Sequence, residues 1–399
     1  MTKDEAEVQH EDLDLFDSAE EPATPARRPR RKPVVLAAVV VVLLLLCWGA
    51  YYGAGRFLGI GSYGDFGGDG GSDVLVQVRD GASTKAIGEM LADNDVVRTG
   101  RAFVNAAGSD DRVGALQPGF YVMKTEMSGK AAVARIVDPA SRVGNLQVKA
   151  GLQLDDTRKP DNSVNPGILS LLAKASCATL DGKQTCVPVE ELRKVAETAD
   201  ATALGVPDWA LSSVAKAEPK HRLEGLILSG VYDVKPGASA QDLLRAVITS
   251  SATKLADVPK LSEDTGFTPY QVLVVASLIE REAIESDFGK VSRVIYNRLA
   301  VGMPMQDDST INYVLDQPLL ATSDADRARP GPYNTYLNTG LTPTPISSPS
   351  QKAMQAAVKP TEGTWVYFVK CDKEGNSCFA TTQAEHDANV SKARAAGIF

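Results

Sequence analysis

The sequence has few of the side chains that commonly hold metal ions. Its 399 residues include five cysteines and three histidines, no Cys-x-x-Cys pair occurs, and His10, His221 and His386 lie far apart in the chain. Structural zinc sites usually draw four Cys or His ligands from short, regular spacings. We therefore expect neither a metal ion nor another cofactor.

Basic clusters are also missing from the part of the chain that is expected to fold. The formal net charge is −8. Domains that bind nucleic acid usually carry a basic patch or stripe that neutralises phosphates. The composition therefore argues against a nucleic-acid partner.

Four of the five cysteines form two close pairs in the sequence. Cys177 is followed by Cys186, and Cys371 by Cys378, whereas Cys47 lies inside an apolar run. Even numbers of cysteines in an oxidising compartment are typical of disulfides. The pairs predict two disulfides that each close a short local loop.

The basic residues that do cluster, at 27–32, precede a long apolar run. Residues 1–33 are polar and acidic at their start, which predicts a disordered cytoplasmic tail. The apolar run 34–54 has about the 20 residues that a transmembrane helix needs, and its basic flank predicts a cytoplasmic N-terminus. A cleaved signal peptide is the alternative, but the leader is long and no small-x-small site closes the run. We expect a single-pass protein of the cell membrane.

The remainder of the chain is then expected outside the cytoplasm, starting with a flexible Gly-rich linker at 55–72. Residues 73–78 alternate as a strand does, and Gly81-Ala82-Ser83 then precedes a helical run. The pattern recurs at 231–239 and, in a degraded form, from Leu146. A strand followed by a Ser-capped helix resembles LysM-like carbohydrate-binding units, which we assign to 73–145, although a plain βα unit explains the pattern as well. Residues 146–222 predict a helical insert with helices near 167–175 and 189–197.

Two carboxylates lie at the end of an apolar helix that Thr268-Pro269 is expected to start. Glu282 follows Leu278 and Ile279 by four and three residues, so it shares their apolar face. Burial disfavours the charged form of a carboxyl, which then keeps its proton and can act as a general acid. Glu280 lies roughly 200° around the helix and is the supporting or alternative acid. The competing interpretation is an ordinary helix end, with one surface glutamate and one glutamate paired to Arg281 or Arg298. Arg298 is the candidate partner for Glu280.

This helix and four later blocks resemble the YceG-like endolytic murein transglycosylases. The blocks, in chain order, are Glu280-Arg281-Glu282, Asn297-Arg298-Leu299, Gln306-Asp307-Asp308-Ser309-Thr310, Tyr333-Asn334-Thr335-Tyr336 and Gly340-Leu341-Thr342-Pro343. The resemblance implies an α+β fold, in which a mixed α/β lytic transglycosylase domain at 223–399 follows the LysM-like region. It also implies a lyase that cuts between N-acetylmuramic acid and N-acetylglucosamine inside nascent peptidoglycan strands, leaves 1,6-anhydro ends and so terminates strand elongation.

By the same resemblance, Glu282 is the general acid and base, and the later blocks form the wall of the substrate cleft. Gln306 and Asp308 are expected to bind sugar hydroxyls or an N-acetyl group. Tyr333, Asn334, Thr335 and Tyr336 offer aromatic faces and an amide for an N-acetylated sugar. The alternative is a turn, since Pro332 and Asn334 are turn formers. His386 either reaches the cleft or, as the sequence favours, caps or packs the last helix.

Two other functions stay open at this stage. The chain departs from the family's motifs at 229–231, Ala283 and Ser309, which is compatible with an inactive protein that binds peptidoglycan as a scaffold. An inverting muramidase-type hydrolase would instead use Asp307 or Asp308 as a second carboxylate. Peptidoglycan strands and the membrane are the expected partners, with peptidoglycan synthases and division proteins as candidates.

Overall fold

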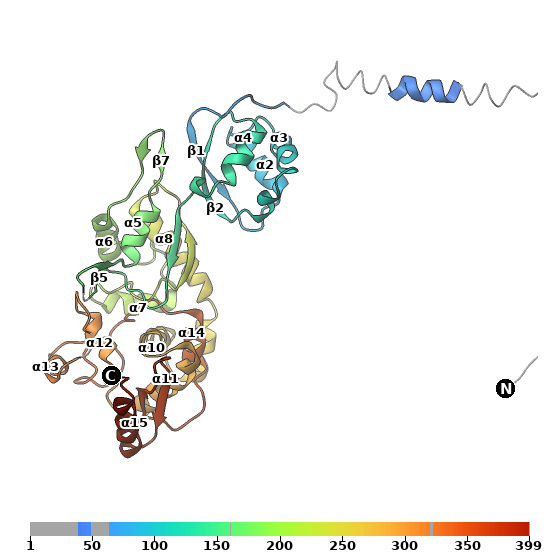
Figure 1. The fold of residues 1–399 in the computed structure, drawn as a ribbon. Coiled ribbons are helices and arrows are strands. Elements are labelled where there is room, and N and C mark those ends of the chain that lie inside the picture. The colour runs from blue at the N-terminus through green and yellow to red at the C-terminus, as the bar shows by residue number, and fades with distance from the viewer. Residues whose placement is uncertain (1–38, 49–63, 160, 320–321, 399) are drawn as a thin grey trace, which may run out of the picture. The chain divides into compact units, whose positions relative to one another are not determined.

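The computed structural model describes residues 39–48, 64–159, 161–319 and 322–398 (Figure 1). Residues 39–48 form a helix, and the rest of the predicted transmembrane segment 34–54 lies outside the described residues, as does the predicted tail 1–33. No helix within the described residues is long and apolar enough to cross a membrane.

The described part of the predicted Gly-rich linker, residues 64–72, is attached to the folded unit that follows it. The Asp65 carboxylate accepts a hydrogen bond from the Gly129 N–H at 3.0 Å. The Gly71 N–H donates to the Thr125 carbonyl at 2.7 Å. Because these bonds hold the backbone in place, the free tether predicted for this stretch does not extend over residues 64–72.

The first hydrophobic core belongs to a small α+β unit with a three-stranded antiparallel sheet in the order β1-β2-β3. Its elements are β1 (Asp73–Val78), α2 (Thr84–Asp93), α3 (Gly100–Ala107), η1 (Asp111–Ala115), β2 (Gly119–Lys124), α4 (Gly129–Ile136), η2 (Pro139–Ser141) and β3 (Arg142–Val143). The Ser83 hydroxyl accepts a hydrogen bond from the Ala86 N–H at 3.2 Å and caps α2, as predicted. Side chains from β1, β2 and the three helices fill the core, among them Val76, Leu91, Phe103, Met123 and Ile136.

The two later copies of the strand pattern pair with each other. β4 (Asn145–Val148) and β9 (Gly230–Asp233) form an antiparallel ladder in which Leu146 lies opposite Tyr232. Ser239 then caps α8 (Ala240–Lys254), again as the pattern predicts.

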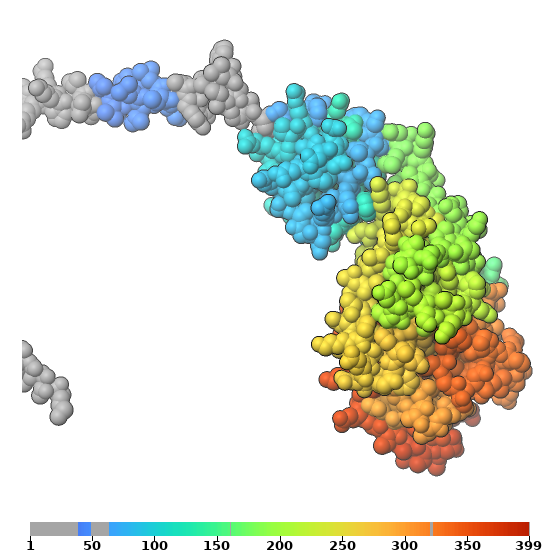
Figure 2. All heavy atoms as spheres, turned by 180° about the vertical axis from the view of Figure 1, so that it is seen from behind, coloured from blue at the N-terminus to red at the C-terminus, as the bar shows by residue number. Residues whose placement is uncertain are grey.

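A second, larger core draws on residues of both 146–222 and 223–399. The elements around it are β5 (Thr157–Arg158), β6 (Val164–Asn165), α5 (Ile168–Ala175), β7 (Thr179–Leu180), β8 (Lys183–Gln184), α6 (Val189–Thr198), α7 (Asp208–Lys216), α9 (Val258–Ser262), η3 (Glu263–Thr265), α10 (Pro269–Glu282), η4 (Glu285–Asp287), α11 (Phe288–Ala300), α12 (Asp308–Tyr313), α13 (Asp324–Arg327) and α14 (Gln351–Val358). Helices α5 and α6 lie within one residue of their predicted positions. In the space-filling view, α8 and α9 cover this core on one face (Figure 2).

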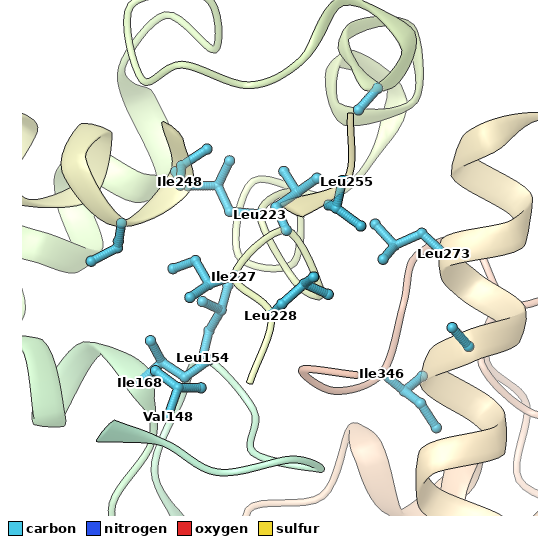
Figure 3. Close-up of a cluster of buried hydrophobic side chains, with 14 of the residues drawn as sticks. Val148, Leu154, Ile168, Leu223, Ile227, Leu228, Ile248, Leu255, Leu273 and Ile346 are labelled. Atoms are coloured by element: carbon cyan, nitrogen blue, oxygen red, sulfur yellow. The ribbon is translucent and has the colours of Figure 1, made fainter. Parts of the chain in front are cut away.

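Helix α10, seen end-on in Figure 1, runs through the larger core and packs against α7, α9, α11, α12 and α14. All of its residues from 272 to 279 are buried. The labelled core side chains come from widely separated segments (Figure 3), namely Val148, Leu154, Ile168, Leu223, Ile227, Leu228, Ile248, Leu255, Leu273 and Ile346. Packing on every side of α10 fixes the position of its C-terminal end.

The C-terminal segment forms a hairpin and a helix, as predicted. β10 (Tyr367–Lys370) pairs antiparallel with β11 (Ser377–Ala380), and α15 (Gln383–Ala395) follows. The structure joins Cys371 to Cys378 across the hairpin and joins Cys177 to Cys186 between α5 and α6.

Candidate active site

Glu282 is the last residue of α10, and its position is set by both ends of that helix. The Thr268 hydroxyl accepts a hydrogen bond from the Gln271 N–H, and the Gln271 side chain accepts one from the Thr268 N–H. This capping box starts the helix at Pro269, as predicted. The backbone turns extended at Ala283, so the helix stops with the Glu282 side chain half-buried at the edge of the core.

Glu282 faces a cavity of about 750 Å³. The end of α10, the loop before α12, α11, α13, β10 and α15 all contribute to its wall. Its polar and aromatic lining includes Arg281, Glu282, Arg298, Gln306, Asp307, Asp308, Arg327, Tyr336, Tyr367, Lys370, Gln383, His386 and Arg394.

The surroundings of Glu282 favour its protonated form. Burial raises the pKa of Glu282, and the charge of Asp308 acts in the same direction, whereas Ser309 and Arg281 lower it. The Ser309 hydroxyl is buried beside this group, and within the described residues it forms no hydrogen bond of ordinary geometry. A carboxyl of raised pKa in a cavity meets the chemical requirement for a general acid.

A second carboxyl, Asp307, is buried in the same wall. It is only 5% exposed, and its Oδ2 has no hydrogen-bond partner among the described residues. Burial and then the charge of Glu282 raise the pKa of Asp307 well above its usual range, while Arg298 opposes them. Sequence analysis named Asp307 only as an alternative base. In the sequence, only the apolar Met305, two residues before Asp307, indicates that Asp307 is buried.

Arg298 holds the loop that carries Asp307. This side chain is 6% exposed, and its guanidinium donates to the carbonyls of Val366, Pro304 and Met305. A planar group with several fixed donors can satisfy three carbonyls at once. Arg298 therefore joins α11 to the strand region of β10 and to the cavity loop.

The predicted pairing of Glu280 with Arg298 is wrong. The Glu280 carboxylate accepts a hydrogen bond from the Ser350 N–H at 2.9 Å, and Ser350 is the N-cap of α14. Glu280 also lies outside the cavity lining. Because a step of two residues turns the side chain to another side of α10, Glu280 supports the start of α14 while Glu282 faces the cavity.

Asp308 and Tyr336 meet in the cavity wall. The Tyr336 hydroxyl donates to Asp308 Oδ1 at 2.6 Å, and the Thr322 hydroxyl donates to the same oxygen. The Arg327 guanidinium lies 5.0 Å from the Tyr336 ring centroid and 3.4 Å from Asp308 Oδ2. These contacts fix the Asp308 carboxylate and the Tyr336 ring in the cavity lining, and sugar binding by both residues stays a prediction.

Gln306 is exposed at the cavity and has an unusual backbone. Its φ is +55°, a left-handed conformation that costs energy in a residue other than glycine. The Gln306 N–H donates to the Thr335 carbonyl, which holds this conformation. The turn presents the amide side chain to the cavity, where sequence analysis placed it.

The other three residues of the Tyr-Asn-Thr-Tyr block lie behind the cavity wall. Tyr333 is buried and its hydroxyl hydrogen-bonds to Thr344. The Asn334 amide donates to two backbone carbonyls, and Thr335 accepts from the Asp307 N–H. Their polar atoms are engaged in the turn that sequence analysis offered as the alternative, so the structure places them as supports rather than in the cavity lining.

His386 lies in the cavity wall instead of at the helix cap. The capping box of α15 consists of Thr382 and Glu385. The His386 ring stacks on Tyr367 with 5.2 Å between ring centroids, and burial lowers the pKa of His386. Of the two roles that the sequence favoured for His386, capping is performed by Glu385. The His386 ring instead packs against Tyr367.

Glu224 is a buried acid that sequence analysis did not single out. It is 2% exposed, and its Oε2 accepts hydrogen bonds from the Leu154 N–H and the Tyr313 hydroxyl at 3.1 and 3.2 Å. The Tyr313 hydroxyl also contacts His221 Nδ1 at 2.8 Å. Because Tyr313 ends α12 and Asp308 begins it, Glu224 anchors the helix that carries part of the cavity wall. The sequence does indicate the burial of Glu224, because this residue is the only charged one in the apolar run 223–228.

We expect Glu224 to make stability depend on pH. Burial raises the pKa of Glu224 to about 8, so the folded protein keeps a proton that the unfolded chain releases. Stability is then fully present below the ordinary glutamate pKa of about 4.3 and is lost as pH rises to about 8, by about 1.4 kcal/mol per pH unit. Urea unfolding at several pH values should show this slope in the wild type and a shallower one in Glu224→Gln.

The matched control for that experiment is Glu218→Gln, because the Glu218 side chain is 70% exposed and lies beside the same histidine. Its pH slope should equal that of the wild type. Parallel slopes for all three proteins would show that Glu224 titrates normally in the folded state.

Fold and cavity together define an α+β protein with a carboxyl of raised pKa in a polar cavity. The model of the YceG-like family matches residues 76–392. The chain belongs to the YceG-like family, which confirms the resemblance drawn from its motifs.

The chain is similar to bacterial proteins of known function or structure. It is 28% identical over 330 residues to the endolytic murein transglycosylase of Bacillus subtilis, a match that covers 80% of this chain and 84% of that protein. It is 27% identical over 340 residues to the endolytic murein transglycosylase of Streptococcus pneumoniae strain D39, covering 80% of this chain and 58% of that longer protein. The crystal structure of a YceG-like protein from Listeria monocytogenes aligns with a TM-score of 0.53 at 24% identity, over 79% of this chain and 98% of that one, and supports the same fold.

Proposed function

We propose that this protein is an endolytic murein transglycosylase, a lyase that cuts the bond between N-acetylmuramic acid and N-acetylglucosamine within peptidoglycan strands. The observation that carries the proposal is Glu282, a carboxyl of raised pKa at the end of a fully packed helix, facing a polar cavity. The relatives named endolytic murein transglycosylase support the same assignment.

In the first step Glu282 gives its proton to the glycosidic oxygen as the bond to C1 of the muramic acid breaks. The leaving N-acetylglucosamine takes up that proton as a free hydroxyl, and positive charge develops on the muramic acid ring. Glu282 is then an anion next to this charge and stabilises it. One group thus provides both the proton and the counter-charge.

In the second step the Glu282 carboxylate takes the proton of the C6 hydroxyl of the same sugar. The C6 oxygen bonds to C1, closes the 1,6-anhydro ring, and returns Glu282 to its protonated state. No water is consumed, so a single carboxyl in two roles completes the reaction. Gln306 and the Asp308–Tyr336 pair hold sugar hydroxyls or the N-acetyl group, since each lines the cavity.

A hydrolase is the second candidate because Asp307 is a further buried carboxyl close to Glu282. An inverting hydrolase uses a second carboxylate as the base that activates water. The raised pKa of Asp307 opposes this role, because a base must be ionised before it can accept a proton.

The products of digestion distinguish these functions. We would incubate the full-length chain in detergent with purified peptidoglycan and determine fragment masses. The lyase predicts fragments one water lighter than hydrolysis products, with no new reducing end. Reducing muramic acid ends would assign a hydrolase, and binding without cleavage would assign a scaffold.

The setting of the enzyme follows as part of the same proposal. A membrane anchor at 34–54 with a cytoplasmic N-terminus would hold the cavity near newly made strands, where cleavage terminates elongation. The strand–helix–helix–strand order of β1, α2, α3 and β2 is compatible with a LysM-like glycan-binding unit. Peptidoglycan synthases and division proteins would be its neighbours.

A further inference from the structure

Among the described residues, two cations of the cavity lining have neither an ion pair nor a side-chain hydrogen bond. Lys370 ends β10 and Arg394 lies on α15, and both side chains are exposed and line the cavity that contains Glu282. Within the described residues, neither forms an ion pair. The other cations of the lining are engaged. Arg327 pairs with Asp308, and Arg281 and Arg298 donate to backbone carbonyls.

The geometry of α15 directs one row of side chains toward the cavity. Successive lining residues of this helix are spaced by three or four positions, which places them on one face. They are Gln383, His386, Val390 and Arg394. Together with Lys370, the polar members Gln383, His386 and Arg394 form what we call the cationic wall.

The sugars of an intact strand offer the cationic wall no anionic partner. N-acetylglucosamine carries no charge, and wherever a stem is attached the lactyl carboxyl of muramic acid is an uncharged amide. The anionic groups of peptidoglycan are the carboxylates of the peptide stems, which branch from the muramic acid whose C1 bond is cut. Lysine and arginine side chains are the natural partners of such carboxylates.

We propose that the cationic wall binds a carboxylate of the peptide stem, so that the enzyme selects strands that still carry stems. This inference rests on the proposed function, because it assigns one part of the same cavity to the stem and the other to the scissile bond. A strand stripped of its peptides, with its lactyl carboxyls blocked as amides, leaves Lys370 and Arg394 unused and is cut more slowly.

The test compares two substrates and two double variants in the full-length chain. The substrates are uncrosslinked strands with intact stems and the same strands after amidase removal of the stems, with the lactyl carboxyl that the amidase frees then blocked as its methylamide. Lys370→Gln/Arg394→Gln removes both cations, and Lys373→Gln/Lys392→Gln is the control, because it makes the same charge change in the same hairpin and helix outside the cavity lining. We expect the first variant to lose roughly tenfold in kcat/KM on stem-bearing strands only, as for two exposed ion pairs.

An equal loss on both substrates, or no loss on either, would overturn the inference. So would a loss confined to strands that end in a lipid pyrophosphate, which would assign the cations to that phosphate. Binding of a soluble muramyl peptide to the Glu282→Gln variant provides an independent measurement. Binding that disappears with Lys370 and Arg394 supports the cationic wall even if the wild type cleaves by hydrolysis, so failure of the proposed function and failure of the inference are separable.

Discussion

Glu282→Gln should abolish cleavage of peptidoglycan while leaving the fold intact. Glutamine keeps the shape and hydrogen-bonding oxygen of the side chain but can neither donate the proton in the first step nor accept one in the second. Loss of a general acid and base typically lowers the rate by 10² to 10⁴-fold, and here one residue performs both steps, so we expect about 10⁴-fold. Mass spectrometry of the released anhydro-muramic acid ends measures this loss of rate.

Glu280→Gln is the matched control, because it makes the same chemical change two residues away on the same helix. Its side-chain oxygen can still accept from the Ser350 N–H, so its activity should stay within a few-fold of the wild type. Residual activity in Glu282→Gln together with an inactive Glu280→Gln would transfer the catalytic role to Glu280.

The same assignment predicts the pH dependence of the wild type. The proton-donating form of Glu282 is required, and burial raises the pKa of Glu282. Activity should therefore persist above the ordinary glutamate pKa and fall as pH rises through the raised value. The fall in kcat/KM at alkaline pH gives the pKa of this general acid, and a pH series of cleavage rates measures it.

Arg298→Ala should produce the largest loss of stability near the site. The buried guanidinium satisfies the carbonyls of Val366, Pro304 and Met305, and each buried carbonyl left without a donor costs about 1–3 kcal/mol. The free energy of unfolding should fall by at least about 3 kcal/mol. Cleavage should fall as well, since the freed loop carries Asp307 and leads into α12. Chemical denaturation and the cleavage assay measure the two effects.

Arg293→Ala is the control from the same helix α11. Arg293 donates to the single Thr361 carbonyl at an exposed position, so its removal should change stability by less than about 1 kcal/mol. Arg298→Lys should lie between them, because one ammonium cannot reproduce the planar set of donors. Equal losses for Arg298→Ala and Arg293→Ala would mean that the buried bonds contribute little.

Local chemistry made much of this molecule predictable. The start of α10 at Pro269 follows from a Thr-Pro cap, and the helices after Ser83 and Ser239 follow from the same kind of cap. The apolar stripe that ends at Glu282 has a helical period. These signals depend on residues within one or two turns of each other, and the structure reproduced each of them.

The errors concern contacts between segments far apart in the chain. Arg298 was a candidate partner for Glu280 on grounds of charge, but it binds the carbonyls of residues 304 and 366. Three residues of the Tyr-Asn-Thr-Tyr block have side chains suited to a sugar, yet their polar atoms are used by the turn that supports Asp307. Composition cannot tell a polar side chain that faces a cavity from one that satisfies the backbone behind it.

By itself, the sequence determined the family, the starts of the capped helices, the two cysteine pairs and the helix face on which Glu282 lies, because each depends on spacing along the chain. Only the tertiary structure decided which groups surround that acid. It placed Asp307 beside Glu282, buried Glu224 under α12, and brought Lys370 and Arg394 from the C-terminal hairpin and helix to the cavity. Burial and charge proximity set a pKa, and both are properties of the packed molecule that no single segment carries.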